Sequence, residues 1–129
     1  MQNSKLVLHA LKEIITNPIY NEGVIKTFFS LNYHQIVNGK NLNFDDFINH
    51  IKFLKQQTTY IKLTVIASAA SGKTVFTHHK VVANKVDGTI ASFEVLAHFS
   101  VMNQKIASCK ELTRVIDGAD SDQDLGSKF

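Results

Sequence analysis

The sequence is poor in the features that mark several large classes of protein. Its single cysteine, Cys109, excludes a scaffold held together by disulfides. No run of about 18 apolar residues is present, which excludes a membrane-spanning helix. The first residues, interrupted by His9, Lys12 and Glu13, do not resemble a signal peptide, because no small-residue cleavage site follows them. We therefore expect a cytoplasmic protein with no membrane partner.

The charge balance is only weakly basic. Fourteen Lys and Arg face eleven Asp and Glu, for a net charge of +3. The basic residues are scattered singly, without the runs or the aromatic neighbours that follow a phosphate backbone, so we expect no nucleic-acid partner. Because 44% of the 129 residues are hydrophobic, the chain can bury a core and is not disordered.

Neither an internal repeat nor a linker divides the chain. We predict one domain over residues 1–118, followed by an acidic polar tail at 119–129. Three tail acids, Asp120, Asp122 and Asp124, resemble the start of a calcium loop. Leu125 occupies the glycine position of that loop and no closing glutamate follows, which argues against a calcium site.

Apolar residues at helical spacing predict three helices in the first half of the chain. Asn3 or Ser4 caps the first helix, which ends at Asn17-Pro18. Asn17 caps the second, with Pro18 at its first position, and the third opens at Asn43. The apolar stripes are Leu6, Val7, Ala10, Leu11, Ile14 and Ile15; then Val24, Ile25, Phe28 and Phe29; then Phe44, Phe47, Ile48, Ile51 and Leu54.

After Gln57 the hydrophobic period changes from 3.6 to 2. Four long strands are predicted at about 60–69, 74–86, 89–101 and 105–116, and a short extended segment near 33–37. The predicted fold is therefore α+β, with three N-terminal helices packed on one face of a curved antiparallel sheet.

Two-residue turns at Ser71-Gly72 and Asp87-Gly88 would determine which side chains face the helices. With these turns, His78 lies opposite Ala97 on the more apolar face. The expected inner face is Leu63, Val65, Ala67, Phe76, His78, Val82, Phe93, Val95, Ala97 and Phe99. The expected outer face is Lys62, Thr64, Thr77, His79, Glu94, Leu96 and His98.

The residues leave two registers open for the last strand. A two-residue loop at Asn103-Gln104 places Ile106, Lys110 and Leu112 inside. A three-residue loop with a bulge places Cys109, Glu111 and Thr113 inside. A slip of one residue reverses every side chain, and each choice buries one charged residue.

Motifs for known chemistries are mostly absent. The stretch ASAASGKT (67–74) ends like a phosphate-binding loop, but it lacks the first glycine and a strand-like pattern follows it. Adjacent strand residues such as His78 and His79 point to opposite faces, so we do not expect them to share a metal ion. Neither a nucleophile elbow nor zinc-ligand spacing is present, so we expect no metal site.

Almost the whole chain resembles the nuclear transport factor 2-like superfamily, specifically its SnoaL-like branch. The resemblance rests on FFSLNYHQIVNGK (28–40), NFDDFINHIKFLK (43–55) and HFSVMNQKIASCKELTRVIDG (98–118); the ending DSDQDLGSK (120–128) is also similar to a tail of some members. It implies a cone-shaped fold. It does not imply one activity, because the superfamily includes isomerases, cyclases, dehydratases, hydrolases and non-catalytic modules.

The resemblance also favours the bulged register of the last strand. Glu111 then corresponds to the aspartate base of SnoaL-like cyclases, with Cys109 and Thr113 beside it. His78 matches a strand position that often holds histidine, and Gln35 matches the glutamine of a Tyr-x-Gln-His segment, although Ile36 replaces its histidine. Ala97 replaces the protonated aspartate of ketosteroid isomerases, so their mechanism is not expected.

We therefore expect a protein that binds a small organic ligand in an apolar pocket, with cofactor-free proton transfer on a carbonyl compound as its possible chemistry. Glu111 and His78 are the expected catalytic residues. The expected pocket residues are Tyr33, Gln35, Phe93, Val95, Ala97, Cys109 and Thr113. The alternative is a non-catalytic dimeric ligand-binding or assembly module, favoured by a cavity below roughly 300 Å³. In either case we expect a homodimer formed through the outer sheet face.

Overall fold

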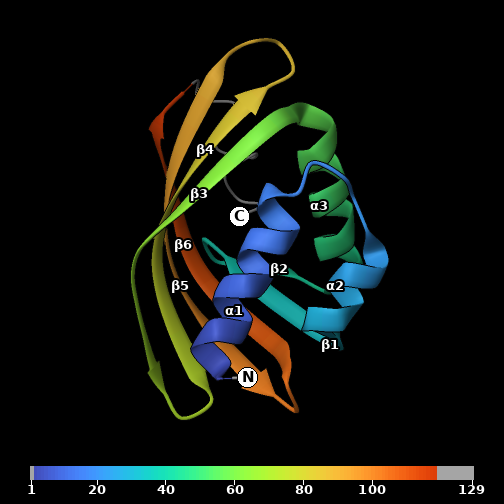
Figure 1. Cartoon of the computed structure of the whole chain (residues 1–129), viewed down its shortest axis with the longest axis vertical. Helices are drawn as coiled ribbons and strands as arrows, with labels where there is room; N and C mark the ends of the chain where they lie inside the picture. The colour runs from blue at the N-terminus through green and yellow to red at the C-terminus, as the bar shows by residue number, and fades with distance from the viewer. Residues whose placement is uncertain (1, 119–129) are drawn as a thin grey trace.

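Helices from the first half of the chain cover one face of a six-stranded sheet in the computed structural model (Figure 1). The structure describes residues 2–118, so the tail predicted at 119–129 lies outside the described residues. The helical segments are α1 (Asn3–Leu11), the π-helical turn η1 (Lys12–Thr16), α2 (Glu22–Phe28) and α3 (Phe44–Gln57). The strands are β1 (Phe29–Val37), β2 (Lys40–Leu42), β3 (Thr58–Ser71), β4 (Thr74–Lys85), β5 (Ile90–Met102) and β6 (Lys105–Asp117).

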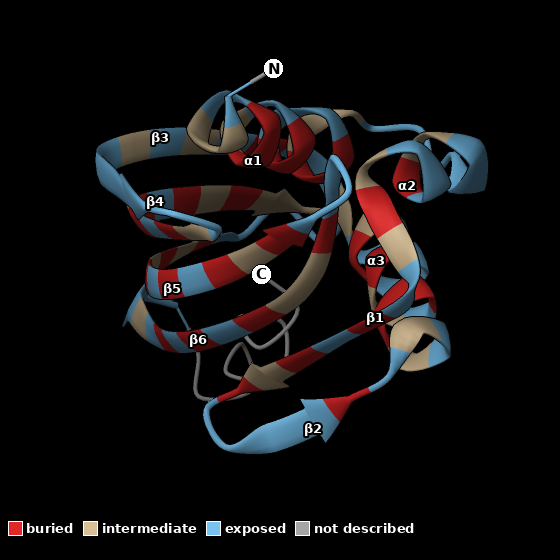
Figure 2. Cartoon of the chain, turned by 90° about the horizontal axis from the view of Figure 1, so that it is seen from below, coloured by how far each residue is buried: buried red, intermediate tan, exposed pale blue. Residues whose placement is uncertain are grey.

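The sheet is curved and remains open at both edges. Its strand order is β2-β1-β6-β5-β4-β3, and all neighbours are antiparallel except β1 and β6, which run parallel. Figure 2 shows the curvature of the strands, with buried positions recurring along β4, β5 and β6. The α+β fold predicted from hydrophobic periodicity is confirmed, and the short extended segment is a full strand, β1, in a hairpin with β2.

Local capping chemistry explains two of the helix starts. At α3, the Asn43 side chain accepts from the Asp46 amide at 2.8 Å, and the Asp46 carboxylate accepts from the Asn43 amide at 3.1 Å. The predicted start of the second helix at Asn17 is wrong. Asn17 instead accepts from the amide of Ile19 within a turn, and Asn21 caps α2.

The predicted register of β4 is wrong by one residue. Asn84 pairs with Ile90, because the connection between β4 and β5 is longer than two residues. A hydrogen bond from the Lys85 amide to the Thr89 carbonyl closes this connection. The hairpin before it pairs Ser71 with Thr74. Since a one-residue slip reverses a strand, the inner side chains of β4 are Val75, Thr77, His79, Val81 and Ala83.

The corrected register moves several residues to the opposite face. Phe76, His78 and Val82 belong to the outer face, whereas Thr77 and His79 are inner residues. A bulge between Val65 and Ala67 also places Ala67 outside. Phe93, Val95, Ala97 and Phe99 of β5 lie inside as predicted.

The last hairpin combines features of both registers considered for it. Asn103 and Gln104, with φ of 52° and 63°, form a two-residue turn that pairs Met102 with Lys105. Ile106 is therefore buried, as in the first alternative. A bulge then intervenes between the pairs Val101–Ile106 and Ser100–Ser108. It reverses the strand, so that Cys109, Glu111 and Thr113 point inward as in the second alternative.

Candidate functional site

Five polar side chains lie together on the inner face, where β1 meets β6. Tyr33 and Gln35 come from β1, and Cys109, Glu111 and Thr113 come from β6; between 2% and 5% of each residue is exposed. The parallel pairing of β1 with β6 sets Gln35 beside Cys109, which brings together residues more than 70 positions apart. All five were predicted as site residues, and we call them the Glu111 cluster.

Hydrogen bonds connect most of the cluster. The Tyr33 hydroxyl donates to Gln35 Oε1 at 2.7 Å, and the Thr113 hydroxyl donates to Glu111 Oε2 at 3.4 Å. Gln35 Nε2 is buried without a hydrogen-bond partner among the described residues. Buried amide N–H groups nearly always have a hydrogen-bond partner. The Gln35 amide is therefore unusual, because it is a free donor inside the fold.

Burial keeps the acids of the cluster protonated. It raises the pKa of Glu111 to about 8, although the Thr113 hydroxyl opposes the shift. It also raises the pKa values of the Tyr33 hydroxyl and the Cys109 thiol, and the neighbouring Glu111 adds to both shifts. No cationic side chain within residues 2–118 forms an ion pair with Glu111. At neutral pH the cluster therefore presents uncharged proton donors.

The cavity above the cluster is small. Its volume is about 20 Å³, and Tyr33, Gln35, Cys109 and Glu111 line it together with apolar side chains of α1, η1 and α3. A cavity of roughly 10–15 Å³ is enough for a single water molecule, whereas ligand pockets measure roughly 300–1,000 Å³. The interior as it stands has room for about one water molecule.

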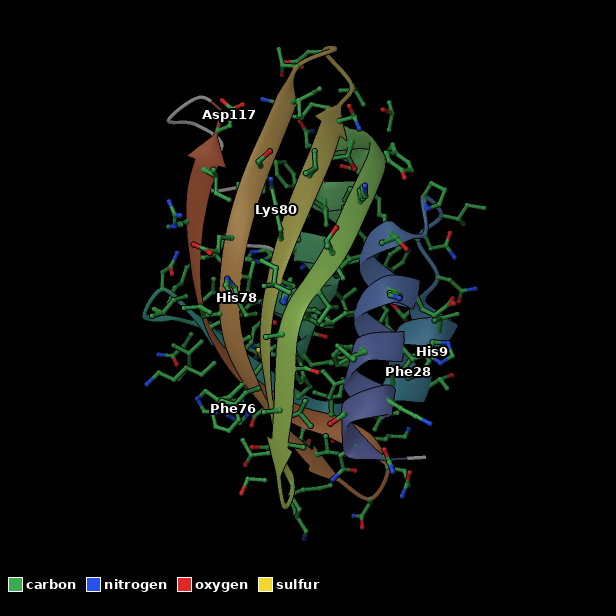
Figure 3. All side chains as sticks on the ribbon, turned by 60° about the vertical axis from the view of Figure 1, so that its left-hand side comes forward. His9, Phe28, Phe76, His78, Lys80 and Asp117 are labelled. Atoms are coloured by element: carbon green, nitrogen blue, oxygen red, sulfur yellow. The ribbon has the colours of Figure 1, made fainter. Side chains whose placement is uncertain are left out.

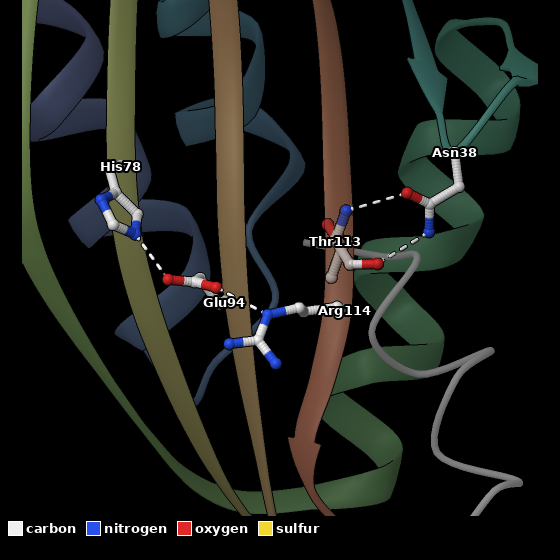
Figure 4. A network of polar contacts seen from close by, with 5 residues as sticks. All are labelled: Asn38, His78, Glu94, Thr113 and Arg114. Carbon is white, nitrogen blue, oxygen red and sulfur yellow. Dashed lines mark hydrogen bonds and ion pairs between the residues drawn. The ribbon is translucent and has the colours of Figure 1, made fainter.

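A side-chain clamp fixes the wall that carries Glu111. Asn38, in the turn between β1 and β2, donates from Nδ2 to the Thr113 carbonyl and accepts from the Thr113 amide, both at 2.9 Å (Figure 4). Asn38 has a φ of 50°, in the left-handed region that asparagine tolerates well. The clamp therefore holds β1 and β6 together beside the cluster.

His78 and the buried Glu111 lie on opposite faces of the sheet, contrary to expectation. It lies on the outer face with Phe76 and Lys80 (Figure 3), and its Nε2 is 2.8 Å from Glu94 Oε2. Arg114 Nε donates to the other oxygen of Glu94 at 2.7 Å (Figure 4), and the hydrogen bonds from His78 and Arg114 lower the pKa of Glu94. His78 is thus part of an outer network, because the register of β4 differs by one residue.

His79 is the inner histidine that sequence reasoning missed. It is fully buried, its Nδ1 lies 3.2 Å from Thr77 Oγ1, and its Nε2 has no hydrogen-bond partner among the described residues. Burial, helped by neighbouring His78, lowers its pKa to about 4, so the ring is neutral. A connection longer than the predicted two-residue turn at Asp87-Gly88 would have placed His79 on the inner face.

The remaining predicted pocket residues are buried in the core but do not line the cavity. Phe93, Val95 and Ala97 are buried on the inner face of β5, and Ala97 pairs directly with Glu111 across β5 and β6. They are absent from the lining of the 20 Å³ cavity. Their place is therefore the core beside the cluster.

The outer sheet face carries the larger hollow. It measures about 540 Å³, and its apolar lining includes Phe76, Leu96 and Leu112, each about half exposed or more. The Phe76 ring stacks on His98 at 5.7 Å between centroids. Solvent-exposed apolar patches of this kind mark interaction surfaces.

Other kinds of site have no support in the described part of the chain. In residues 2–118, no three His, Cys, Asp or Glu side chains are grouped so that they could hold a metal ion. Over the same residues, no helix has both the length and the apolar character needed to cross a bilayer.

Comparison with known proteins gives one relative in sequence and many in structure. No family model matches the chain. An uncharacterized protein of Schizosaccharomyces pombe is 29% identical over 126 residues, covering 98% of this chain and 97% of the relative. The match therefore spans nearly all of both chains.

Two solved structures share the arrangement of helices and strands. A candidate SnoaL-like polyketide cyclase from Jannaschia sp. CCS1 superposes with a TM-score of 0.71 at 11% identity, covering 86% of this chain and 84% of that one. An NTF2-like protein of unknown function from Exiguobacterium sp. 255-15 gives 0.69 at 15% identity, covering 83% and 97%. The chain therefore has the nuclear transport factor 2-like fold, in the form shared with SnoaL-like proteins.

Proposed function

We propose that the chain is a binding module for a small, uncharged carbonyl compound held at the Glu111 cluster. The observation that carries this is the Glu111 carboxyl, which is buried without a cationic partner in residues 2–118 and has a pKa raised to about 8. A protonated carboxyl donates a hydrogen bond to a carbonyl oxygen. A buried acid with such a shifted pKa also marks a functional candidate on physical grounds.

Binding fits the cluster better than proton abstraction. Glu111 was expected to be a base, but a base must be deprotonated at the working pH. Tyr33, Cys109 and Glu111 all have raised pKa values, so none of these three supplies a base at neutral pH. The unpaired N–H of Gln35 adds a second donor for the same carbonyl oxygen. Glu111 would act as the acid, and proton abstraction would need pH above about 8.

Titration with simple ketones tests this function. We expect cyclohexanone or acetophenone to bind the wild type and to bind about tenfold more weakly at pH 9 than at pH 7, because the protonated fraction of Glu111 falls about tenfold. Glu111→Ala should bind weakly at both pH values. Calorimetric or fluorescence titration measures these affinities.

The matched control for this titration is His78→Ala. His78 lies on the outer face, so this variant should bind ketones as the wild type does. Equal affinity of Glu111→Ala and the wild type would contradict the proposal, and so would the absence of saturable ketone binding to the wild type.

We also propose that two copies pair through the outer sheet face. The alternative function, a non-catalytic dimeric module, requires such a pair. Strands β3 to β6 have 12 to 14 residues each. At about 4.8 Å between strands and about 3.3 Å per residue, their face covers roughly 800 Å². This matches the roughly 800 Å² per partner of a standard interface. The 20 Å³ interior also favours this function.

Leu96→Asp tests the dimer. Leu96 is 51% exposed and lines the outer hollow, so a charge there should convert a dimer into a monomer, as measured by sedimentation or light scattering. Ile19→Asp is the control, because Ile19 is exposed between η1 and α2, away from the sheet face. A wild type that sediments as a monomer at high concentration would contradict the dimer.

A further inference from the structure

The way into the cluster is a separate question, because every residue that lines its cavity is buried. We propose that Ile15 closes the entrance to the Glu111 cluster, and that ligand enters from a cleft between η1 and the start of β3. This inference rests on the ligand site proposed above. It adds the route and the residue that limits which compounds pass.

Two cavities meet at a single residue. The cleft measures about 260 Å³ and is lined by residues that include Ile15, Pro18, Lys55, Tyr60 and Ile61. Ile15 also lines the 20 Å³ cavity that contains Glu111 and Cys109. Ile15, which is 4% exposed, is the one residue that lines both the cleft and this cavity.

The segment that carries Ile15 has an unusual backbone. η1 (Lys12–Thr16) is a π-helical turn that packs on β3 and ends at Asn17-Pro18. π-Helical turns are rare and frequently occur at functional sites. Proline cannot continue the hydrogen-bond pattern of a helix, so the carbonyl groups at this end need other donors.

One lysine supplies those donors. Lys55 of α3 donates from Nζ to the carbonyl oxygens of Ile14, Ile15 and Asn17, the contact with Ile15 being 3.2 Å. The backbone around Ile15 is therefore held from the side of the cleft. With the backbone held, we expect rotation of the Ile15 side chain to join the two spaces.

The lining of the route indicates the class of ligand. The walls of the cleft are mainly apolar, and the hydroxyls of Thr16 and Thr58 already donate to the carbonyls of Lys12 and Leu54. At the inner end, Glu111 and Gln35 supply polar donors. A fitting ligand has one carbonyl group at its tip and an apolar body no larger than about 260 Å³.

The single cysteine makes this entrance measurable without any ligand. Cys109 lines the inner cavity and is 5% exposed, so the rate of its alkylation by N-ethylmaleimide at pH 8.5 reports access to the cluster. We expect Ile15→Ala to be alkylated at least tenfold faster than the wild type, with Ile15→Val between them. The milder Ile15→Val keeps the test valid where Ile15→Ala folds poorly.

Leu6→Ala is the matched control for lost packing. Leu6 is as buried as Ile15 but lines neither the cleft nor the cavity. Labelling through the entrance should not change with low urea, whereas labelling through unfolding should rise with it. If Ile15→Ala and Leu6→Ala react at equal rates, or if urea accelerates both alike, the entrance is elsewhere. Because no ligand is used, that outcome leaves the ketone titration to test the proposed function by itself.

Discussion

Replacing Glu111 with glutamine is expected to make the protein more stable than the wild type at alkaline pH. The pKa of Glu111 is about 8 in the folded protein, against 4.5 as its ordinary value. Between these values the unfolded chain releases a proton that the folded chain keeps, so the wild type loses stability as pH rises. At about 1.4 kcal/mol per pH unit, the loss is on the order of 4 kcal/mol by pH 8.

Glu111→Gln removes this titration and keeps the shape of the side chain. We expect the two proteins to lie close in stability near pH 5, and the variant to exceed the wild type by several kcal/mol at pH 9. Urea unfolding at pH 5, 7 and 9 measures the difference. Groups that titrate in both proteins cancel in this comparison.

Glu94→Gln is the control for a carboxyl on the other face. Its neighbours His78 and Arg114 lower the pKa of Glu94, so its replacement should bring no gain at high pH. If wild type and Glu111→Gln lose the same stability between pH 5 and pH 9, the Glu111 carboxyl is not buried in a protonated state.

The second large effect is expected at acid pH, from His79. Its pKa is lowered from 6.5 to about 4 in the folded protein. The contribution of neutral His79 to stability is fully present above pH 6.5 and is lost as the pH falls towards 4. In this range His79 takes up a proton in the unfolded chain but not in the folded protein. At about 1.4 kcal/mol per pH unit, the loss is on the order of 3 kcal/mol.

His79→Leu should remove this acid sensitivity. His79→Leu lacks the contact with Thr77, and the free energy of unfolding at pH 7 includes that loss. Between pH 7 and pH 4 the variant should gain about 3 kcal/mol of unfolding free energy relative to the wild type. Urea unfolding across this range measures the change, and His34→Leu, on the exposed side of β1, should follow the wild type. A constant gap between His79→Leu and the wild type from pH 7 to pH 4 would show that His79 is protonated in the fold.

The two titrations act in opposite directions between pH 4.5 and 6.5. There the loss from Glu111 with rising pH offsets the gain from His79, so the stability of the wild type should change little. Outside this window each group acts alone. The single variants therefore separate two effects that the wild type hides.

The sequence by itself was sufficient for the elements and their class. The helical stripes, the capping pair Asn43 and Asp46 and the change of period after Gln57 are local patterns. The structure confirms the three helices and four long strands that they predict, although the second helix begins at Glu22 rather than after Asn17. The five residues of the Glu111 cluster were also named from sequence. Their convergence depended on a resemblance to a fold, because the residues leave the register of the last strand open.

Tertiary structure alone decided which side of β4 and which side of β6 faces inward. The orientation of β4 depended on one extra residue in the connection to β5, and that of β6 on a bulge after Ile106. The hydrophobic pattern of β4 could not decide its orientation, because valines occur on both faces. The observed register makes His79, rather than His78, the buried histidine. Periodicity is encoded locally, whereas the register of a sheet is determined by turns, bulges and contacts with distant helices.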